Sequence, residues 1–165
     1  MNSRVLVSVG SNVNAESNVR RSIDEIRSDF GALALSPVYQ SASVGFQGDD
    51  FLNLVVRFET DYSIYQVVDR LHEIERRMGR DRRQPKFSSR PIDLDLLTFN
   101  GLILDEDNIQ VPRHEILMNG FVLKPMQDLV PEELHPEVGK TYRQLWQDME
   151  IHAPTLTLLD LEGLD

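Results

Sequence analysis

The chain has 165 residues, 41% of them hydrophobic, and a formal net charge of -10 at pH 7. This length predicts one domain, over residues 1–165, with a core large enough to be stable without disulfide bonds. The chain contains no cysteine and so forms none. The acidic balance argues against a nucleic-acid partner, because a phosphate backbone repels such a surface. No stretch approaches the roughly 20 apolar residues that span a bilayer, so we expect no membrane partner. The lack of cysteine fits a cytoplasmic location.

The first third of the chain alternates apolar runs with a helical pattern. Residues 5–9 predict a buried strand that stops in a tight turn at Gly10. A helix follows, capped by Asn14 and ended by Gly31. Residues 33–39 then return to extended structure.

The middle of the chain repeats this alternation. Residues 51–59 predict a second long strand, and Ser63 begins a helix that ends at Gly79. A basic loop leads from there into a strand over residues 90–99. The order strand, helix, strand, strand, helix, strand predicts a ferredoxin-like α+β sandwich, with helices packed on an antiparallel sheet.

Shorter elements are expected in the last third. They are a hairpin partner over residues 102–104, helical turns over 114–119, a helix over 121–129 that Pro125 interrupts, and a helix over 141–149. Residues 151–165 receive no assignment from the sequence.

Two carboxylates lie two residues apart in the strand over residues 90–99. Because alternate side chains of a strand share a face, Asp93 and Asp95 project together while Leu94 and Leu96 project to the other side. Two like charges at this spacing repel unless a positive charge lies close to both. Oxygen ligands without cysteine or clustered histidine favour Mg²⁺. The alternative is a half-exposed strand whose polar face carries two aspartates.

Basic charge is concentrated just before this strand. Residues 76–90 hold seven basic residues and one acid, Asp81, in a chain that is acidic overall. A basic loop that runs into a carboxylate pair indicates a site for a polyphosphate, whose charge metal ions and arginines share. The alternative is a solvated charged loop.

Several motifs together resemble one known family, the 6-hydroxymethyl-7,8-dihydropterin pyrophosphokinases. They occur in the family's order and span about residues 4–135: Val7-Ser8-Val9-Gly10-Ser11-Asn12, Phe51-Leu52-Asn53, Gly79-Arg80-Asp81-Arg82, Ser89-Arg90-Pro91-Ile92-Asp93-Leu94-Asp95-Leu96-Leu97, Val111-Pro112 and Gly120-Phe121-Val122-Leu123-Lys124-Pro125. The resemblance implies a ferredoxin-like fold. It also implies transfer of diphosphate from ATP to the hydroxymethyl group of the pterin, with release of AMP, in folate biosynthesis.

The resemblance also implies roles for individual residues. Asp93 and Asp95 would hold two Mg²⁺ ions that bridge the phosphates of ATP, and two loop arginines, Arg80 and Arg82, would close over the reacting phosphates. Nucleotide contacts are implied for Glu75, Arg80, Arg82, Arg90, Arg113 and His114. Pterin contacts are implied for Ser41, Ala42, Val44, Phe51, Asn53 and Phe121, with the two phenylalanines stacked on the two faces of the ring. Glu75 is equally consistent with a solvent-exposed position on its helix.

The sequence departs from the family's pattern near one end of the implied site. Arg113 stands where the family typically has the histidine that touches ATP, and His114 follows it. Asn119 stands where the family often has arginine, and Phe87 where many members have tryptophan.

Three functional hypotheses follow. The first is the pterin diphosphokinase, expected as a monomer. The second is a paralogue with weak or altered activity, which the departures at Arg113 and Asn119 motivate. The third is a non-catalytic ferredoxin-like binding module that uses the basic loop for an acidic partner or RNA.

Overall fold

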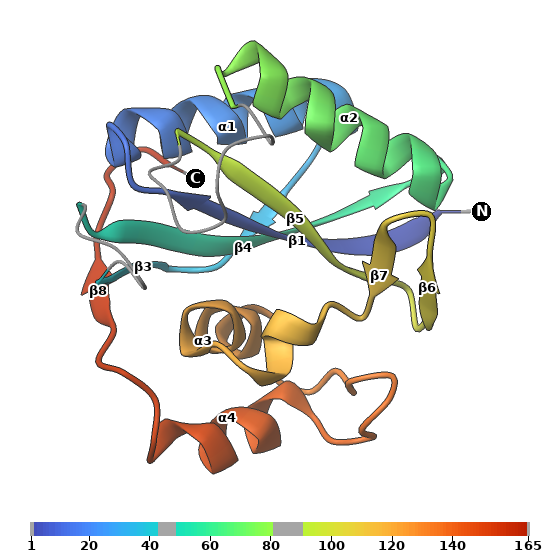
Figure 1. The fold of residues 1–165 in the computed structure, drawn as a ribbon, viewed down its shortest axis with the longest axis vertical. Helices are drawn as coiled ribbons and strands as arrows, with labels where there is room; N and C mark the ends of the chain where they lie inside the picture. Colours follow the sequence, from blue (N-terminus) through green and yellow to red (C-terminus); the bar gives the residue numbers. More distant parts are fainter. Residues whose placement is uncertain (1, 43–48, 81–90, 165) are drawn as a thin grey trace.

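The computed structural model describes residues 2–42, 49–80 and 91–164, and one antiparallel sheet organises them (Figure 1). Its strands are β1 (Ser3–Ser11), β2 (Ala34–Leu35), β3 (Val38–Ser41), β4 (Phe51–Thr60), β5 (Asp93–Phe99) and β8 (Thr157–Leu159). Their order is β5-β1-β4-β3-β8, and β2 also pairs with β4. The predicted α+β class with an antiparallel sheet is confirmed.

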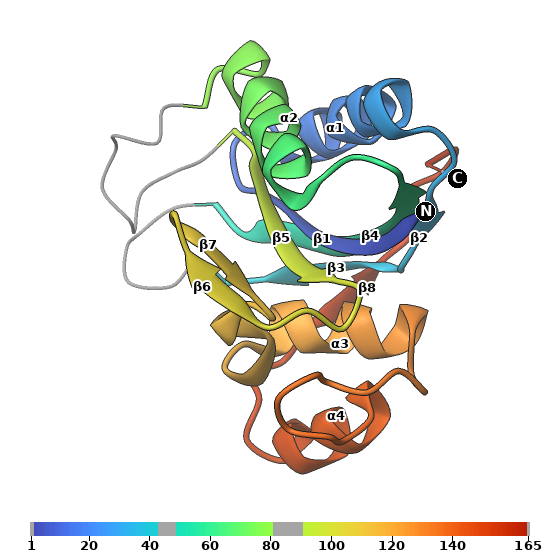
Figure 2. The same ribbon diagram turned by 90° about the vertical axis from the view of Figure 1, so that its right-hand side faces the viewer.

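Helices cover both faces of this sheet, as Figure 2 shows in side view. On one face lie α1 (Ala15–Phe30) and α2 (Ile64–Arg77). On the other lies α3 (Gly120–Leu129), with α4 (Tyr142–Glu150) packed on its outer side. A small hairpin of β6 (Leu104–Glu106) and β7 (Ile109–Val111), followed by the short helix η1 (His114–Leu117), connects β5 to α3. No helix in the described ranges is long and apolar enough to cross a membrane.

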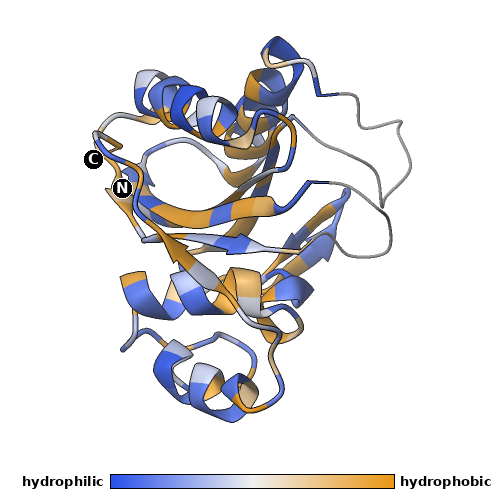
Figure 3. Ribbon diagram, turned by 90° about the vertical axis from the view of Figure 1, so that its left-hand side faces the viewer, coloured by the Kyte–Doolittle hydropathy of each residue, from blue (hydrophilic) through white to orange (hydrophobic). Residues whose placement is uncertain are grey.

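The alternation of side chains along the strands gives the protein two apolar cores. Val5, Val7 and Val9 of β1 point toward α1 and α2, whereas Leu6 of the same strand packs with residues of α3 and α4. Figure 3 shows the consequence: hydrophobic residues concentrate in the sheet and on the helix sides that face it, while the outer helix surfaces are hydrophilic. The sheet is therefore buried on both faces over most of its area.

Helix α2 begins where the sequence predicts. The Ser63 side chain accepts a hydrogen bond from the backbone N–H of Gln66, and the Gln66 side chain accepts one from the N–H of Ser63, which completes a capping box. The helix ends just before Gly79, which has a positive φ of 87°. This position fixes where the chain leaves the helix for the basic loop.

Three details of the predicted elements are wrong. Strand β1 does not stop at Gly10 but continues through Ser11, because both residues pair with β4. Residues 102–104 form no hairpin with β5; the hairpin is that of β6 with β7. Helix α3 runs through Pro125 without interruption, since its apolar side is anchored in the second core.

The tail left unassigned from the sequence joins the two layers. Strand β8 pairs with β3 and so adds the last strand to the sheet. The chain then reaches the α1 face, where Leu164 enters the first core. Arg20 and Arg27 of α1 donate hydrogen bonds to the backbone carbonyls of Glu162 and Leu164. The tail therefore packs on both the sheet and α1.

Candidate active site

The two aspartates of β5 share a face, as the sequence predicts. Leu94 and Leu96 enter the first core, and the aspartates project toward the opposite side of the sheet. Their side chains are 18% exposed for Asp93 and 20% for Asp95. Both carboxylates are thus partly withdrawn from water and reachable from outside.

Glu75 of α2 holds the strand between these aspartates. Its residue is only 1% exposed, and its Oε2 accepts a hydrogen bond of 2.8 Å from the backbone N–H of Leu94. Among the described residues β5 is an edge strand, so this N–H faces no strand on its outer side, and the carboxylate of Glu75 accepts its hydrogen bond instead. The reading of Glu75 as a solvent-exposed surface residue is therefore wrong.

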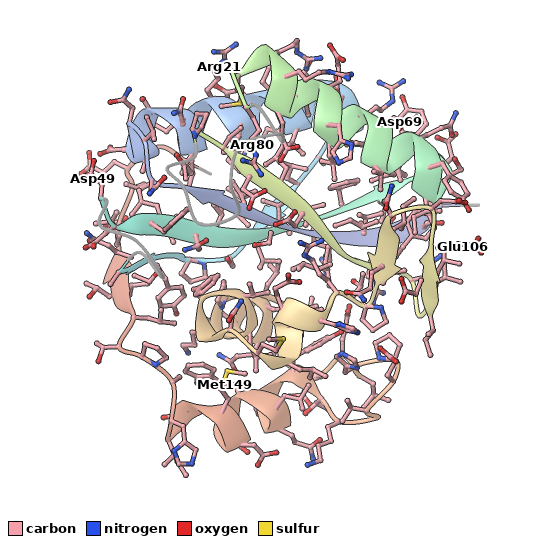
Figure 4. The ribbon with its side chains drawn as sticks, in the orientation of Figure 1. Arg21, Asp49, Asp69, Arg80, Glu106 and Met149 are labelled. Carbon is pink, nitrogen blue, oxygen red and sulfur yellow. The ribbon has the colours of Figure 1, made fainter. Side chains whose placement is uncertain are left out.

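Arg80 lies against β5 between two acidic groups, and Figure 4 labels it there. Its Nη2 is 3.6 Å from Oδ1 of Asp93, and its Nε is 4.0 Å from Oε2 of Glu75. The side chain is 7% exposed, and Nε is a buried donor without a hydrogen-bond partner in the part of the chain that the structure describes. This buried N–H of Arg80 could donate a hydrogen bond to an anionic ligand that binds here.

Arg113 approaches the second aspartate from the end of β7. Its backbone N–H donates to the carbonyl of Leu97, which fixes the residue beside β5. Its Nη2 is 3.7 Å from Oδ1 of Asp95, and its Nε is 2.8 Å from Oε2 of Glu115. The neighbouring His114 is exposed and contacts the side chain of Gln110 instead.

The carboxylate pair meets the requirements of Mg²⁺. Among the described residues, no cluster of three or more His, Cys, Asp or Glu side chains could hold a metal ion by itself. Mg²⁺ does not need such a cage, because it typically takes one or two carboxylates and completes its six ligands with water and phosphate oxygens. Asp93 and Asp95, with arginines beside them, fit a metal that arrives with a polyphosphate.

Beside the carboxylates, the sheet carries a row of residues in register. Tyr39 of β3 pairs with Asn53 of β4, which pairs with Gly10 of β1, which in turn pairs with Asp93 of β5. At the usual strand spacing, Asn53 therefore lies about 10 Å from Asp93. A Cβ on Gly10 would lie 2.8 Å from Oδ1 of Asn53, so the glycine makes room for the amide.

The implied pterin residues gather around this amide. Ser41 is buried, and its Oγ lies 3.5 Å from Nδ2 of Asn53 as a weak acceptor. Phe51 lies on the same face of β4 as Asn53, two residues earlier, and pairs with Ser41 in the sheet. Ala42 is exposed at the end of β3. Phe121 is half-buried in the first turn of α3, the helix that covers this face.

A polar network attaches α3 to the sheet near this site. The hydroxyl of Tyr39 donates to Asp128, which also accepts a hydrogen bond of 2.9 Å from Nζ of Lys124. Burial, and then the adjacent carboxylate, raise the pKa of Tyr39 far above its ordinary value, so the hydroxyl remains a donor. The helix that carries Phe121 is thereby fixed over β3.

A recess opens on the other side of Asp95, between α2 and the strands β5 and β7. It is lined by Val68, Leu71, His72, Leu94, Asp95, Leu96, Asn108, Ile109, Gln110 and Arg113. Three polar residues of this lining, His72, Asn108 and Gln110, were not predicted from the sequence. The one available signal was His72, which precedes Glu75 by one helical turn and so faces the same strand.

The structure brings residues implied by the sequence together as two neighbouring groups. One holds Glu75, Arg80, Asp93, Asp95 and Arg113, and the other holds Ser41, Phe51 and Asn53. It does not bring His114 into contact with the aspartates. Val44, Arg82 and Arg90 lie outside the described residues.

Comparison with known proteins identifies the family. The model of the 7,8-dihydro-6-hydroxymethylpterin-pyrophosphokinase family matches residues 6–131. This chain belongs to that family. Members of the family carry out pyrophosphoryl transfer to a pterin in folate synthesis, and the match covers the strands, helices and loops that build the site above.

Individual relatives carry names that match this family. The chain is 31% identical to the 2-amino-4-hydroxy-6-hydroxymethyldihydropteridine pyrophosphokinase of Pseudomonas aeruginosa, over 81% of this chain and 85% of that protein. It is 27% identical to the enzyme of the same name from Synechocystis, over 93% and 84%. It is also 27% identical to the folic acid synthesis protein FOL1 of Dictyostelium discoideum, of which it spans only 22%.

Solved structures show the same fold. The HPPK-DHPS protein of Plasmodium falciparum with STZ-DHP superposes with a TM-score of 0.71 at 13% identity, over 92% of this chain and 43% of that one. The same protein with pteroate gives a TM-score of 0.68, and this chain spans 44% of its length. The ferredoxin-like class predicted from the sequence is confirmed by this likeness.

Proposed function

We propose that this chain transfers diphosphate from ATP to the hydroxymethyl group of 6-hydroxymethyl-7,8-dihydropterin and releases AMP. One observation carries the proposal: two carboxylates on one face of β5 are each faced by an arginine, and one of them, Asp93, lies in register with a buried amide two strands away. The first group suits a metal–triphosphate, and the second suits the edge of a heterocycle. Their separation of about 10 Å leaves room for the two substrates to meet.

The reaction needs in-line displacement at one phosphorus. The pterin hydroxyl oxygen forms a bond to the β-phosphorus of ATP, the bond from that phosphorus to the α,β-bridging oxygen breaks, and AMP takes the electron pair. The hydroxyl proton passes to solvent. Mg²⁺ held by Asp93 and Asp95 supplies charge neutralisation and draws electron density from the β-phosphorus when it is bound.

The protein's share of the chemistry is positioning and charge. Arg80, with its buried Nε donor, is proposed to contact a phosphate oxygen near Asp93, together with Arg82 and Arg90 of the basic segment. Glu75 keeps β5 and therefore both aspartates in place through Leu94. Its role in nucleotide binding is thus indirect.

The recess beside Asp95 is the proposed site for the base of ATP. Its walls combine apolar Val68, Leu71 and Ile109 with the amide of Gln110, which suits a flat heterocycle that carries donors and acceptors at its edge. Arg113 lies at the boundary of the recess and Asp95, where the triphosphate would begin. His114 is proposed to act there only through Gln110.

The amide group on the other side is the proposed pterin site. Asn53 offers a donor and an acceptor at once, and it is proposed to recognise the pterin edge together with Ser41. Phe51 and Phe121 are proposed to stack on the ring, and Ala42 and Val44 to line its edge. The row from Asn53 to Asp93 would direct the hydroxymethyl group toward the phosphates.

The test is a single assay. The purified chain is mixed with hydroxymethyldihydropterin, ATP and Mg²⁺, and AMP is measured against time, with omission of the pterin as the control. Rapid pterin-dependent AMP formation supports the proposal. Slow formation favours a paralogue with altered activity, and neither turnover nor pterin binding favours a non-catalytic module.

A further inference from the structure

Arg113 makes two contacts of different strength. Its Nε lies 2.8 Å from Oε2 of Glu115, which makes this the closer of its two ion pairs. Its Nη2 lies 3.7 Å from Asp95, which is too long for a hydrogen bond and leaves an ion pair. The guanidinium therefore lies close to Glu115 at its Nε end and farther from Asp95 at the end that faces the metal-type carboxylate.

This arrangement makes Arg113 a competitor of any cation at Asp95. A divalent ion on Oδ1 of Asp95 would face the guanidinium, and the two positive charges would repel each other. A small movement of the side chain could carry the terminal nitrogens away from Asp95 while the ion pair with Glu115 is kept. An anionic phosphate beside the ion would give those nitrogens a new partner.

We infer that Arg113 exchanges partners during binding: it neutralises Asp95 before the metal arrives and passes to the ATP phosphates when metal and nucleotide arrive together. This inference rests on the proposed function, because the metal–ATP complex is the ligand concerned. Glu115 is the positioning residue that keeps the guanidinium within reach of both partners. As a result, metal binds weakly alone and strongly with nucleotide, and each ligand tightens the other by the same factor.

The test measures metal affinity in the absence of any reaction. Mn²⁺ is titrated into the protein without nucleotide, and the free ion is followed by its electron paramagnetic resonance signal. We expect Arg113→Ala to bind Mn²⁺ about two- to fivefold more tightly than the unaltered protein, the range that loss of a partly exposed ion pair allows. Arg113→Gln, which keeps most of the side-chain volume, should show the same gain.

Arg77→Ala is the matched control. Arg77 is 38% exposed and ion-paired with Glu25 of α1, against 33% for Arg113, so its removal changes the net charge equally without touching Asp95. Its Mn²⁺ affinity should change less than about twofold. A gain in the control as large as that in Arg113→Ala would mean that overall charge, and not exchange, sets metal affinity.

The second measurement uses α,β-methylene-ATP, in which the bond that would break is blocked. With Mn²⁺ present, Arg113→Ala should bind this nucleotide about tenfold more weakly, because a charge-assisted contact to phosphate is lost. The factor by which nucleotide tightens Mn²⁺ binding should fall accordingly. The inference is overturned if the Arg113 variants bind Mn²⁺ no more tightly than Arg77→Ala. It is also overturned if neither the Arg113 variants nor Arg77→Ala bind Mn²⁺ detectably.

The failure of this inference can be told from failure of the proposed function. The two titrations contain no pterin and need no turnover. If the unaltered protein binds Mn²⁺ and α,β-methylene-ATP as described but forms no AMP from pterin and ATP, the proposed function fails and the exchange stands. If it forms AMP but the Arg113 variants leave Mn²⁺ affinity unchanged, only the exchange fails.

Discussion

Gly10→Ala should damage pterin binding and spare ATP binding. The new Cβ would lie 2.8 Å from Oδ1 of Asn53, where an ordinary contact is 3.4 Å or more, so the amide must retreat by roughly half an ångström. Asn53 is buried and its Nδ2 already faces Ser41, which limits the directions in which it can move. We therefore expect the amide to lose its alignment with a ligand at the sheet surface.

The size of the effect follows from the hydrogen bonds at risk. Misplacing one buried amide costs about 1–3 kcal/mol of binding free energy, which corresponds to roughly five- to hundredfold in pterin KM. ATP KM should change less than about twofold, since the nucleotide residues lie on the far side of Asp93. Stability should fall by no more than about 1 kcal/mol, because the clash involves the end of a side chain and not the backbone of β4.

The assay is AMP formation with one substrate varied and the other saturating. Gly101→Ala is the control, since a Cβ there meets nothing within 4 Å, and both KM values should stay unchanged. The same substitution at Gly10 is also made in an Asn53→Ala background, where it should have no further effect. A normal pterin KM in Gly10→Ala, or a full additional loss in the double variant, would refute the reasoning.

Four further outcomes are expected. Asp95→Ala should abolish AMP formation while its circular dichroism and unfolding midpoint stay near normal; retention of most of the Mg²⁺-dependent activity would contradict the metal assignment. Glu75→Ala leaves the N–H of Leu94 without its acceptor, so urea titration should show a loss of roughly 2–4 kcal/mol of unfolding free energy. Leu164→Ala should cost roughly 1–3 kcal/mol in the same measurement, and an unchanged midpoint would mean that the tail does not hold the domain. Burial lowers the pKa of His135 below its ordinary value of about 6.5, so the unfolded chain takes up a proton first and the free energy of unfolding should fall from pH 7 toward pH 5; His135→Asn should flatten this slope.

Much of the fold and the centre of the site could be predicted from local patterns. The capping box at Ser63 and the alternation through Asp93 and Asp95 depend on neighbouring residues alone, so the sequence displays them directly. Glu75 could have been predicted as buried too, because it follows Leu71 by four residues and so lies on the apolar stripe of α2. A charged side chain on the apolar face of a helix indicates that it contacts a specific buried group, which for Glu75 is the backbone N–H of Leu94.

Other features depend on partners that are distant in the sequence. Gly10 resembles a turn residue locally, but the side chain of Asn53 from another strand needs the space above it. Pro125 removes one backbone hydrogen bond of α3, and the burial of Val122, Leu123 and Met126 outweighs that loss. The pairing of Arg113 with both Asp95 and Glu115 likewise depends on how β7 approaches β5, which no local pattern encodes.

The C-terminal tail has a consequence for how the protein folds. The hydrogen bond from Arg27 to Leu164 joins residues that are 137 positions apart, and β8 joins the sheet only at the outer side of β3. Contacts that close such long loops tend to form slowly, so we expect the sheet up to β3 to assemble before β8 pairs with it. Until then β3 is an open edge with unpaired backbone groups, which can pair with a second chain. Pairing of the tail therefore covers the edge of the strand that carries Ser41, which would otherwise be open to pairing with a second chain.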